Sequence, residues 1–413
     1  MRIAIVGTGV SGLTTAWLLA RRHEVHVFEA DDRIGGHSNT VLCGPADAPI
    51  PVDTGFIVYN ERTYPLFTSL LAQLNVATQP STMSLSVRDE AADLEYNGTS
   101  LNGLFAQRSN LLRPGFYGML RDLLRFNRLA LANDAFPGSL HEFLRAFEVS
   151  ERLTRHYIIP MTSAIWSAPR DAVLAMPMRF FVRFFANHGM LTVNNRPQWR
   201  TITGGSRSYV AALTAPFLSR IRTRTPVRSI RRGESAVTLT TDSGTESFDH
   251  AVIAAHSTDA LALLADPSTA ERSVFSAIPY QANEAVLHTD TRLLPRRRRA
   301  WAAWNAHVDA SETPADAPTG VTYNLTILQN LPTTEQYLVT LNRAHAIDPR
   351  RIIRRIQYHH PVFSAQAVAA QSRHAEISGV RRTHYCGAYW GFGFHEDGVR
   401  SATVVARAFG ERL

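Results

Sequence analysis

The sequence predicts an α/β protein in which a Rossmann-type domain is interrupted by a mixed α+β part. Three observations lead to this prediction. The first forty residues alternate between short apolar runs, a glycine-rich turn and a helical segment. Strand-like and glycine-rich segments return after residue 195 and again near the end of the chain. Helical patterns dominate the first intervening stretch, and strand-like patterns the second. We therefore expect a nucleotide-binding domain formed by residues 1–60, 195–280 and 375–413, and a substrate-binding domain formed by residues 61–194 and 281–374.

The opening segment has the pattern of a strand, a turn and a helix. Residues 3–6 form an apolar run typical of a parallel strand that is buried on both faces. In the turn, Gly7 allows the tight bend, Gly9 lets the backbone approach a pyrophosphate and Gly12 lets the helix pack on the strand. The N–H groups and the positive dipole end of that helix then point toward the phosphates.

A second strand, Val25–Phe28, ends on Glu29, about twenty residues beyond the glycines, where a carboxylate can accept hydrogen bonds from ribose hydroxyls. A lone glycine triad is weak evidence, and a chance glycine-rich turn is the alternative. The strand, turn, helix and acid in this order predict a dinucleotide site.

A second glycine pair follows in Arg33-Ile34-Gly35-Gly36-His37. It resembles the corresponding segment of FAD-binding proteins of the glutathione-reductase and amine-oxidase type, whose usual form is Arg-x-Gly-Gly-Arg. His37 stands in the place of the last Arg. The resemblance implies FAD rather than NAD as the cofactor. Together the motifs and the resemblance assign to FAD binding Gly7, Gly9, Val10, Ser11, Gly12, Glu29, Ala30, Arg33, Gly35, Gly36, His37, Ser38, Thr54, Gly55, Phe56, Ile57, Val227, Gly387, Glu396, Gly398 and Val399.

The bulk composition is that of a globular enzyme of two to three domains, with 413 residues, 45% hydrophobic and 19% charged. The strand pattern begins at residue 2, so we expect no signal peptide, and no apolar run reaches the length of a membrane-spanning helix. The two cysteines, Cys43 and Cys386, support neither a disulfide framework nor a cysteine metal site. These features predict a cytoplasmic protein without a metal ion.

The net charge is +8, and all 43 cationic residues are Arg because the chain contains no Lys. Compositional bias is the plain explanation, and attraction to an anionic membrane surface at the inner face of the cell membrane is the functional one. No nucleic-acid-binding signature is present, so nucleic acid is not expected as a partner. The missing Lys excludes Schiff-base chemistry and lysine-bound PLP. It also excludes the lysine–water–flavin arrangement of many amine oxidases.

The stretch from residue 61 to residue 197 is mainly helical, with helices expected over 64–74 and 115–133. In the second helix we expect one apolar stripe, with the charged residues on the other face. That helix either packs on the core or lies on a membrane. The aromatic run 176–185 predicts core packing, with an apolar substrate tunnel as the alternative. The Arg clusters 296–299 and 350–355 are either solvated surface or contacts for phosphate headgroups. In the expected apolar stripe lie Phe116, Met119, Leu120, Leu123, Leu124, Ala130 and Leu131.

The chain returns to the nucleotide domain through Gly204-Gly205, which resembles the re-entry segment of flavin amine oxidases. Strands are expected next over 227–230, 236–241 and 248–254, with turns between them. The resemblance implies that Val227 makes a backbone contact to adenine. Further strands are expected over 286–288, 321–324 and 337–342.

The chain closes with a strand, a Gly-rich segment from Gly387 to Gly398, and a helix. In FAD oxidases of this type the final helix directs its N-terminus at the flavin, where it can stabilise the negative charge of the reduced ring. Glu396 and Asp397 also suit the first turn of that helix as simple caps. Because the chain has no Lys, the candidate bases are His395, Glu396, Tyr59 and His37.

The whole chain resembles flavin amine oxidase-like proteins. Within them it most resembles a bacterial branch that includes the fatty acid desaturase of furan fatty acid synthesis, which acts on a methyl-branched monounsaturated acyl chain. Four segments carry this resemblance, at residues 53–60, 94–101, 164–167 and 393–398. It implies a fatty acyl or phospholipid substrate.

The leading hypothesis is therefore an FAD-dependent desaturase of a lipid acyl chain. A hydride would leave an allylic carbon for flavin N5, and a base would take the adjacent proton. An amine oxidase is the runner-up, and a redox-neutral isomerase of an acyl double bond is a third alternative. A non-catalytic, FAD-bound lipid carrier is a fourth. The exact acyl chain, the electron acceptor and the oligomeric state stay open.

Overall fold

The computed structural model describes residues 1–192, 194–308 and 320–413, which form two compact units. Unit 1 comprises Met1–Gln79, Ile202–Gln281 and Pro361–Leu413, and unit 2 comprises Pro80–Thr201 and Ala282–His360. The division expected from the sequence places 195–201 in the nucleotide-binding domain, although these residues belong to unit 2. It also assigns 61–79 and 361–374 to the substrate-binding domain. Both stretches belong to unit 1, since Phe67 and Ala367 lie in its hydrophobic clusters.

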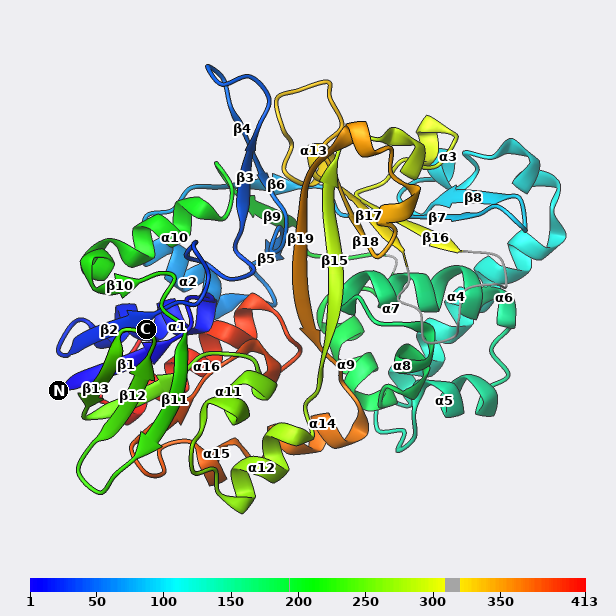
Figure 1. The fold of residues 1–413 in the computed structure, drawn as a ribbon. Coiled ribbons are helices and arrows are strands. Elements are labelled where there is room, and N and C mark those ends of the chain that lie inside the picture. Colours follow the sequence, from blue (N-terminus) through cyan, green and yellow to red (C-terminus); the bar gives the residue numbers. More distant parts are fainter. Residues whose placement is uncertain (193, 309–319) are drawn as a thin grey trace. The chain divides into compact units, whose positions relative to one another are not determined.

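Unit 1 is built on a five-stranded parallel sheet with the order β10-β2-β1-β14-β20. Three of these strands, β10, β2 and β1, are labelled in Figure 1. Along β1 the side chains alternate between two hydrophobic clusters. Ile3 and Ile5 belong to one cluster, and Ala4 and Val6 belong to the other. This explains the unbroken apolar run of the sequence, since a strand covered on both faces buries every residue. The strands are β1 (Arg2–Val6), β2 (Glu24–Phe28), β10 (Ile221–Arg222), β14 (His250–Ile253) and β20 (Thr383–Tyr385).

Helices cover both faces of this sheet. The cluster around Ile5 includes residues of α1 (Val10–Leu19), α2 (Pro65–Gln73), α10 (Arg207–Thr214) and α16 (His395–Ala408). The cluster around Ala4 includes residues of α11 (Ser257–Leu263), α12 (Thr269–Ser276), α14 (Ala365–Gln371) and α15 (His374–Ile377). This arrangement confirms the predicted α/β class.

Two antiparallel elements complete unit 1. One is the ribbon of β3 (Thr40–Cys43) and β4 (Ile50–Asp53), and the other is the sheet of β11 (Val227–Arg232), β12 (Val237–Thr241) and β13 (Gly244–Phe248). The sequence predicted β11, β12 and β14 but missed β13. Most of its side chains are exposed and polar, so no apolar alternation marks it.

Unit 2 contains a seven-stranded mixed sheet with the order β19-β15-β18-β17-β16-β7-β8. The pair β16/β7 is parallel, whereas β15/β18, β18/β17, β17/β16 and β7/β8 are antiparallel. The long strands β15 and β19 run side by side (Figure 1). The strands are β7 (Leu85–Asp89), β8 (Leu94–Asn97), β15 (Tyr280–His288), β16 (Trp304–Val308), β17 (Val321–Asn324), β18 (Leu338–Leu341) and β19 (Ile352–Pro361). The chain passes from one unit to the other within β6 (Thr78–Ser81), β9 (Trp199–Ile202), β15 and β19. The strands β5 (Tyr59–Asn60), β9 and β6 form a small sheet.

The helices of unit 2 are α3 (Leu101–Leu104), α4 (Pro114–Ala132), α5 (Leu140–Ala146), α6 (Glu151–Leu153), α7 (Ile159–Trp166), α8 (Arg170–Ala175), α9 (Met178–Asn187) and α13 (Leu325–Leu328). The aromatic run of the sequence forms α9, whose rings are buried against one another. Phe181 stacks on Phe185 with 3.9 Å between ring centroids, and Phe184 lies 4.7 Å from Trp166. These contacts agree with the core-packing interpretation.

The structure corrects the predicted faces of α4. Phe116, Met119 and Ala130 are buried as expected, but Leu124 and Leu131 are exposed on the opposite face. The reason is helical geometry: at 100° per residue, Leu124 lies about 140° around the helix from Met119. Phe126 and Asn127 take the buried positions instead. Within the described residues no helix is long and apolar enough to cross a membrane.

Candidate functional site

The glycine-rich turn between β1 and α1 is shaped for close backbone approach. Gly7 has φ +104°, and its N–H donates to the Phe28 carbonyl at 2.8 Å. A Cβ at Gly12 would overlap the carbonyl oxygen of Gly7, so only glycine fits there. Beside Gly9, in contrast, a Cβ would meet no atom within 4 Å. No side chain caps the N-terminus of α1, so its first N–H groups are available to an anionic group beside Gly9.

Glu29 is attached to this turn by Thr8, a residue that the sequence analysis did not assign. One oxygen of the Glu29 carboxylate accepts from the Thr8 amide at 3.0 Å and from the Thr8 hydroxyl. The other oxygen accepts from the Asp31 amide at 2.9 Å. The Gly35 amide donates to the Thr8 hydroxyl at 3.2 Å, so Thr8 joins both glycine motifs. A carboxylate offers about four acceptor sites, which leaves capacity for ribose hydroxyls.

The second glycine pair packs directly on the first. Gly36 has φ +59°, and a Cβ added to it would lie 3.0 Å from the Cα atom of Gly9. Arg33, three residues before Gly36, has a buried Nη1 atom without a hydrogen-bond partner among the described residues. A buried, unsatisfied guanidinium donor suits an anionic ligand. Ala30, between Glu29 and Arg33, is exposed.

Ser38, Tyr209 and His395 form a buried polar cluster. The Nε2 atom of His395 lies 3.0 Å from the Tyr209 hydroxyl oxygen and 3.1 Å from the Ser38 hydroxyl oxygen. The two hydroxyl groups also contact each other. Burial lowers the pKa of His395 to about 3 and raises the pKa of Tyr209. The imidazole is therefore neutral at physiological pH and holds its position through the two hydroxyl groups.

Two phenylalanines link the four candidate bases. His395 stacks on Phe56 with 3.4 Å between ring centroids and meets Phe67 edge-on at 5.4 Å. Tyr59 also meets Phe67 edge-on at 5.4 Å. The backbone carbonyl of His37 accepts from the Phe56 amide at 2.8 Å. These residues, which are far apart in the sequence, therefore belong to one neighbourhood of unit 1.

Glu396 joins the same neighbourhood by capping α2. Its two carboxylate oxygens accept from the Leu66 amide at 3.2 Å and from the Phe67 amide at 3.0 Å. Arg400 approaches one of these oxygens at 3.7 Å. Burial raises the pKa of Glu396, and the two amides oppose this rise. The carboxylate is thus committed to a helix N-terminus, an arrangement that the sequence did not indicate.

The first turn of α16 lies against the first turn of α1. A Cβ at Gly398 would lie 2.6 Å from Cγ1 of Val10 and 3.0 Å from Oγ of Ser11. Val399 is fully buried in the cluster around Ile5. Gly387, ahead of this helix, donates its N–H to the hydroxyl of Ser401 at 2.9 Å. The structure therefore brings the last predicted FAD segment to the first one.

The segment from Thr54 to Ile57 lies beside residues 37–39, of which His37 and Ser38 are predicted FAD residues. Thr54 donates its amide and its hydroxyl to the Asn39 carbonyl, at 2.9 and 3.1 Å. Gly55 and Ile57, on either side of Phe56, are both partly exposed. The chain thus lies along the second glycine motif.

Val227 begins β11 at the nucleotide end of the parallel sheet. Two residues earlier, the Thr225 amide donates to the Glu29 carbonyl at 2.8 Å. Val227 itself is buried and pairs with Thr241 next to a bulge. The Thr225 contact places Val227 two residues from a backbone partner of Glu29, and its adenine contact stays a prediction.

Asp53 is a buried carboxylate that the sequence analysis did not single out. It accepts from the Thr40 hydroxyl at 2.6 Å and from the amide and the hydroxyl of Ser206, each at 2.9 Å. Burial raises the pKa of Asp53 to about 6, although these bonds oppose the rise. Gly205 has φ +82°, and a Cβ there would press on Thr40 and Asp53. Asp53 therefore holds the start of α10 against the β3–β4 ribbon.

These features fit FAD. The uncapped α1 N-terminus, the open space beside Gly9 and the unsatisfied Arg33 suit a pyrophosphate, and Glu29 suits a ribose. Among the described residues no group of three His, Cys, Asp or Glu side chains could hold a metal ion. Cys43 and Cys386 are free and buried, and burial raises the pKa of Cys386 to about 12.

Comparisons with known proteins agree with this site. The family model of flavin containing amine oxidoreductases matches residues 10–409. A putative flavin-containing monoamine oxidase, AofH, of Mycobacterium tuberculosis is 27% identical over 282 residues. That match covers 64% of this chain and 59% of the relative, so the chain spans less than two thirds of the curated relatives it matches.

Two solved structures share the fold over 99% of this chain. Cyclohexylamine oxidase from Brevibacterium oxydans IH-35A has a TM-score of 0.70 with 17% identity, over 99% of its own chain. A CLA-producing fatty acid isomerase from P. acnes has a TM-score of 0.69 with 16% identity, over 98% of its own chain. The family match covers nearly the whole chain, including α1, β2 and α16. The chain therefore belongs to the flavin containing amine oxidoreductase family, and FAD is its cofactor.

Proposed function

We propose that this protein is an FAD-dependent oxidoreductase that desaturates a fatty acyl chain of a membrane lipid, specifically a methyl-branched unsaturated chain. The observation that carries the proposal is the absence of Lys from the whole sequence. The lysine–water–flavin arrangement of many amine oxidases therefore has no counterpart here. The resemblance of the segments 53–60, 94–101, 164–167 and 393–398 to a lipid-modifying branch supports the acyl substrate.

When bound, FAD would supply the two-electron acceptor for a hydride from the allylic carbon, and desaturation would also require loss of a proton from the adjacent carbon. The protein must receive that proton. His395, with a pKa of about 3, is a weak base at neutral pH, and its Nε2 atom is engaged by Ser38 and Tyr209. Glu396 has both oxygens on backbone amides of α2. We assign these two residues positioning roles, and we retain Tyr59 and His37 as candidate proton acceptors.

The test is a product analysis under anaerobic conditions. FAD-loaded protein is incubated with a phospholipid that carries a methyl-branched monounsaturated chain, and the released acyl chains are examined by mass spectrometry and ultraviolet absorption. We expect a conjugated diene two hydrogens lighter than the substrate, together with loss of the oxidised flavin absorbance in equal amount. A phospholipid with saturated chains is the control. The absence of both diene and flavin reduction would contradict the proposal.

Amine oxidation is the second candidate because the family and the curated relative carry that description. Hydrogen peroxide released from a panel of primary amines would favour it. Acyl double-bond isomerisation is a further candidate, since the fold is shared with a fatty acid isomerase. It would give a product of unchanged mass with a shifted double bond. Stable FAD that no lipid or amine reduces would instead indicate a non-catalytic lipid carrier.

A further inference from the structure

Exposed apolar side chains are concentrated in one part of unit 2. Twelve large apolar residues are exposed among the described residues, and half of them lie between residues 101 and 131. Leu101 and Leu112 are the most exposed, at 77% and 87%. Single exposed apolar residues are common on soluble proteins, but a local concentration indicates an interaction surface. These six residues are Leu101, Leu111, Leu112, Tyr117, Leu124 and Leu131.

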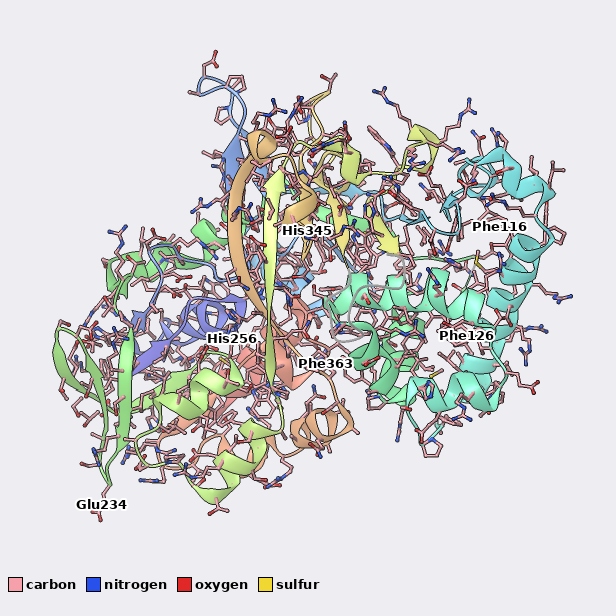
Figure 2. The ribbon with its side chains drawn as sticks, turned by 45° about the vertical axis from the view of Figure 1, so that its right-hand side comes forward. Phe116, Phe126, Glu234, His256, His345 and Phe363 are labelled. Carbon is pink, nitrogen blue, oxygen red and sulfur yellow. The ribbon has the colours of Figure 1, made fainter. Side chains whose placement is uncertain are left out.

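The outer side of α4 has a regular pattern of apolar and basic residues. Tyr117, Arg121, Leu124, Arg128 and Leu131 follow one another at intervals of four and three residues, so they share one face. All five are exposed. The opposite side of α4 buries Phe116 and Phe126 (Figure 2). Phe126 packs against rings of α5 and α9, and Phe116 packs against Tyr96 of β8.

The short 3-10 helix η1 (Arg108–Leu112) extends this face at the start of α4. The Tyr117 hydroxyl donates to the Leu111 carbonyl at 3.1 Å, which holds η1 beside the first turn of α4. We use the name α4 face for Leu112, Tyr117, Arg121, Leu124, Arg128 and Leu131.

The charge of this region is strongly positive. Residues 101–132 contain five Arg and a single acid, Asp122, and one of the five, Arg113, pairs with Asp93 outside this range. Asp122 is half-buried, pairs with Arg125 and accepts from the Ser150 amide, so its charge is already compensated. Arg121 and Arg128 have no ion-pair partner among the described residues, whereas several Arg of the other basic clusters are paired. Examples are Arg297 with Glu95 and Arg350 with Asp348.

We propose that the α4 face is a docking surface for an anionic lipid bilayer. An interfacial helix inserts apolar side chains between headgroups, while basic side chains contact the phosphates. The α4 face offers both kinds of side chain on one line, and its unpaired Arg residues match the negative charge of the partner. The inference goes beyond the proposed reaction, because vesicle binding is measured without turnover.

The experiment is cosedimentation of the FAD-loaded full chain with vesicles whose acyl chains are saturated, so that no desaturation substrate is present. Vesicles of phosphatidylcholine mixed equally with phosphatidylglycerol are compared with vesicles of phosphatidylcholine alone. We expect binding to the anionic vesicles that weakens as salt is raised. The double variant Arg121→Gln/Arg128→Gln should bind about tenfold more weakly, and Leu112→Gln roughly fivefold more weakly.

Matched controls lie in unit 1, where Leu218 is exposed in a similar way and Arg272 is exposed on α12. Leu218→Gln and Arg272→Gln should bind like the unchanged protein. Thermal unfolding of every variant checks that the fold is retained, and Leu124→Gln replaces Leu112→Gln if the latter fails to fold. Equal binding to both vesicle types, or equal losses in the control variants, would overturn the proposal. Loss of lipid desaturation with intact vesicle binding would instead contradict only the proposed reaction.

Discussion

The Nε2 atom of His395 lies 3.0 Å from the hydroxyl oxygen of Tyr209, 186 positions away in the chain. His395 is the first residue of α16, and Tyr209 lies in α10. Ser38 completes the contact from the second glycine motif. One buried imidazole therefore joins three separate segments of unit 1, and its low pKa keeps it neutral while it does so.

Tyr209→Phe tests this contact. The substitution removes a hydroxyl group that contacts both His395 and Ser38 without leaving a large cavity. We expect the free energy of unfolding to fall by about 1–2 kcal/mol, since buried polar atoms lose a partner. Urea unfolding of the FAD-loaded protein measures the change. Tyr117→Phe is the control, since its hydroxyl is exposed, and it should change stability by less than about 0.5 kcal/mol. Equal effects of the two variants would contradict the assigned role.

Asp53 predicts a specific pH dependence of stability. Its pKa is about 6 in the folded protein, against an ordinary value of 3.8. The folded state therefore binds the proton of Asp53 more tightly than the unfolded state does. The resulting stabilisation of the folded state is complete below pH 3.8 and is lost as the pH rises through about 6.

Asp53→Asn removes the titrating group and keeps one acceptor oxygen for Thr40 and Ser206. Between pH 4 and pH 8, the free energy of unfolding of the unchanged protein should fall by up to about 3 kcal/mol relative to that of this variant. The quantity to compare is the difference in free energy of unfolding between the two proteins. His395 titrates in an overlapping pH range, but it is present in both proteins, so its contribution cancels in this difference. A difference that does not vary with pH would show that the pKa of Asp53 is not raised.

Gly12→Ala tests the fit of the first glycine motif. The new Cβ would overlap the Gly7 carbonyl, so β1 and α1 would have to separate. We expect the purified variant to retain less than about a tenth of the FAD content of the unchanged protein, because a misplaced α1 N-terminus no longer meets the phosphates. Gly118→Ala in α4 is a matched control, because its Cβ would meet no atom within 4 Å. That control should keep FAD and gain up to about 1 kcal/mol of stability.

Arg33→Gln tests whether the unsatisfied guanidinium contacts the cofactor phosphates. A lost charge-assisted hydrogen bond is worth about 1.5–3 kcal/mol, so the FAD dissociation constant should rise roughly tenfold to a hundredfold. Calorimetric titration of FAD into the apoprotein gives this constant. Arg224, which is largely exposed beside Asp32, provides the control Arg224→Gln with unchanged affinity. Unchanged affinity in Arg33→Gln would remove this residue from the site.

The parts of the fold and site that sequence could predict are those encoded by neighbouring residues. The turn around Gly9, the acid Glu29 and the strand at 321–324 each depend on short patterns, and the structure contains them as expected. The flavin amine oxidase-like family and FAD were implied by the resemblance of those motifs to that family, and both are confirmed. The lipid-modifying branch within the family stays a prediction. The division of functions between the units, the substrate and the catalytic base remain predictions.

What sequence could not predict depends on residues that meet only in the folded chain. Glu396 caps α2 across about 330 positions of the chain, and no local sequence pattern predicts this contact. The contacts of the Tyr209 hydroxyl could not be predicted either, because its partners lie in distant segments of the chain. The exposed side of α4 was misassigned for a different reason. The predicted stripe was wider than one helix face, and Leu124 and Leu131 lie more than about 100° around the helix from Met119.

The most direct test of the central claim is the rate of flavin reduction in the absence of oxygen. FAD-loaded protein is mixed rapidly with the methyl-branched unsaturated phospholipid or with a panel of primary amines, and the flavin absorbance is followed. We expect that the lipid reduces the flavin completely and that no amine does so at a comparable rate. Rapid reduction by an amine, with no reduction by the lipid, would contradict the central claim.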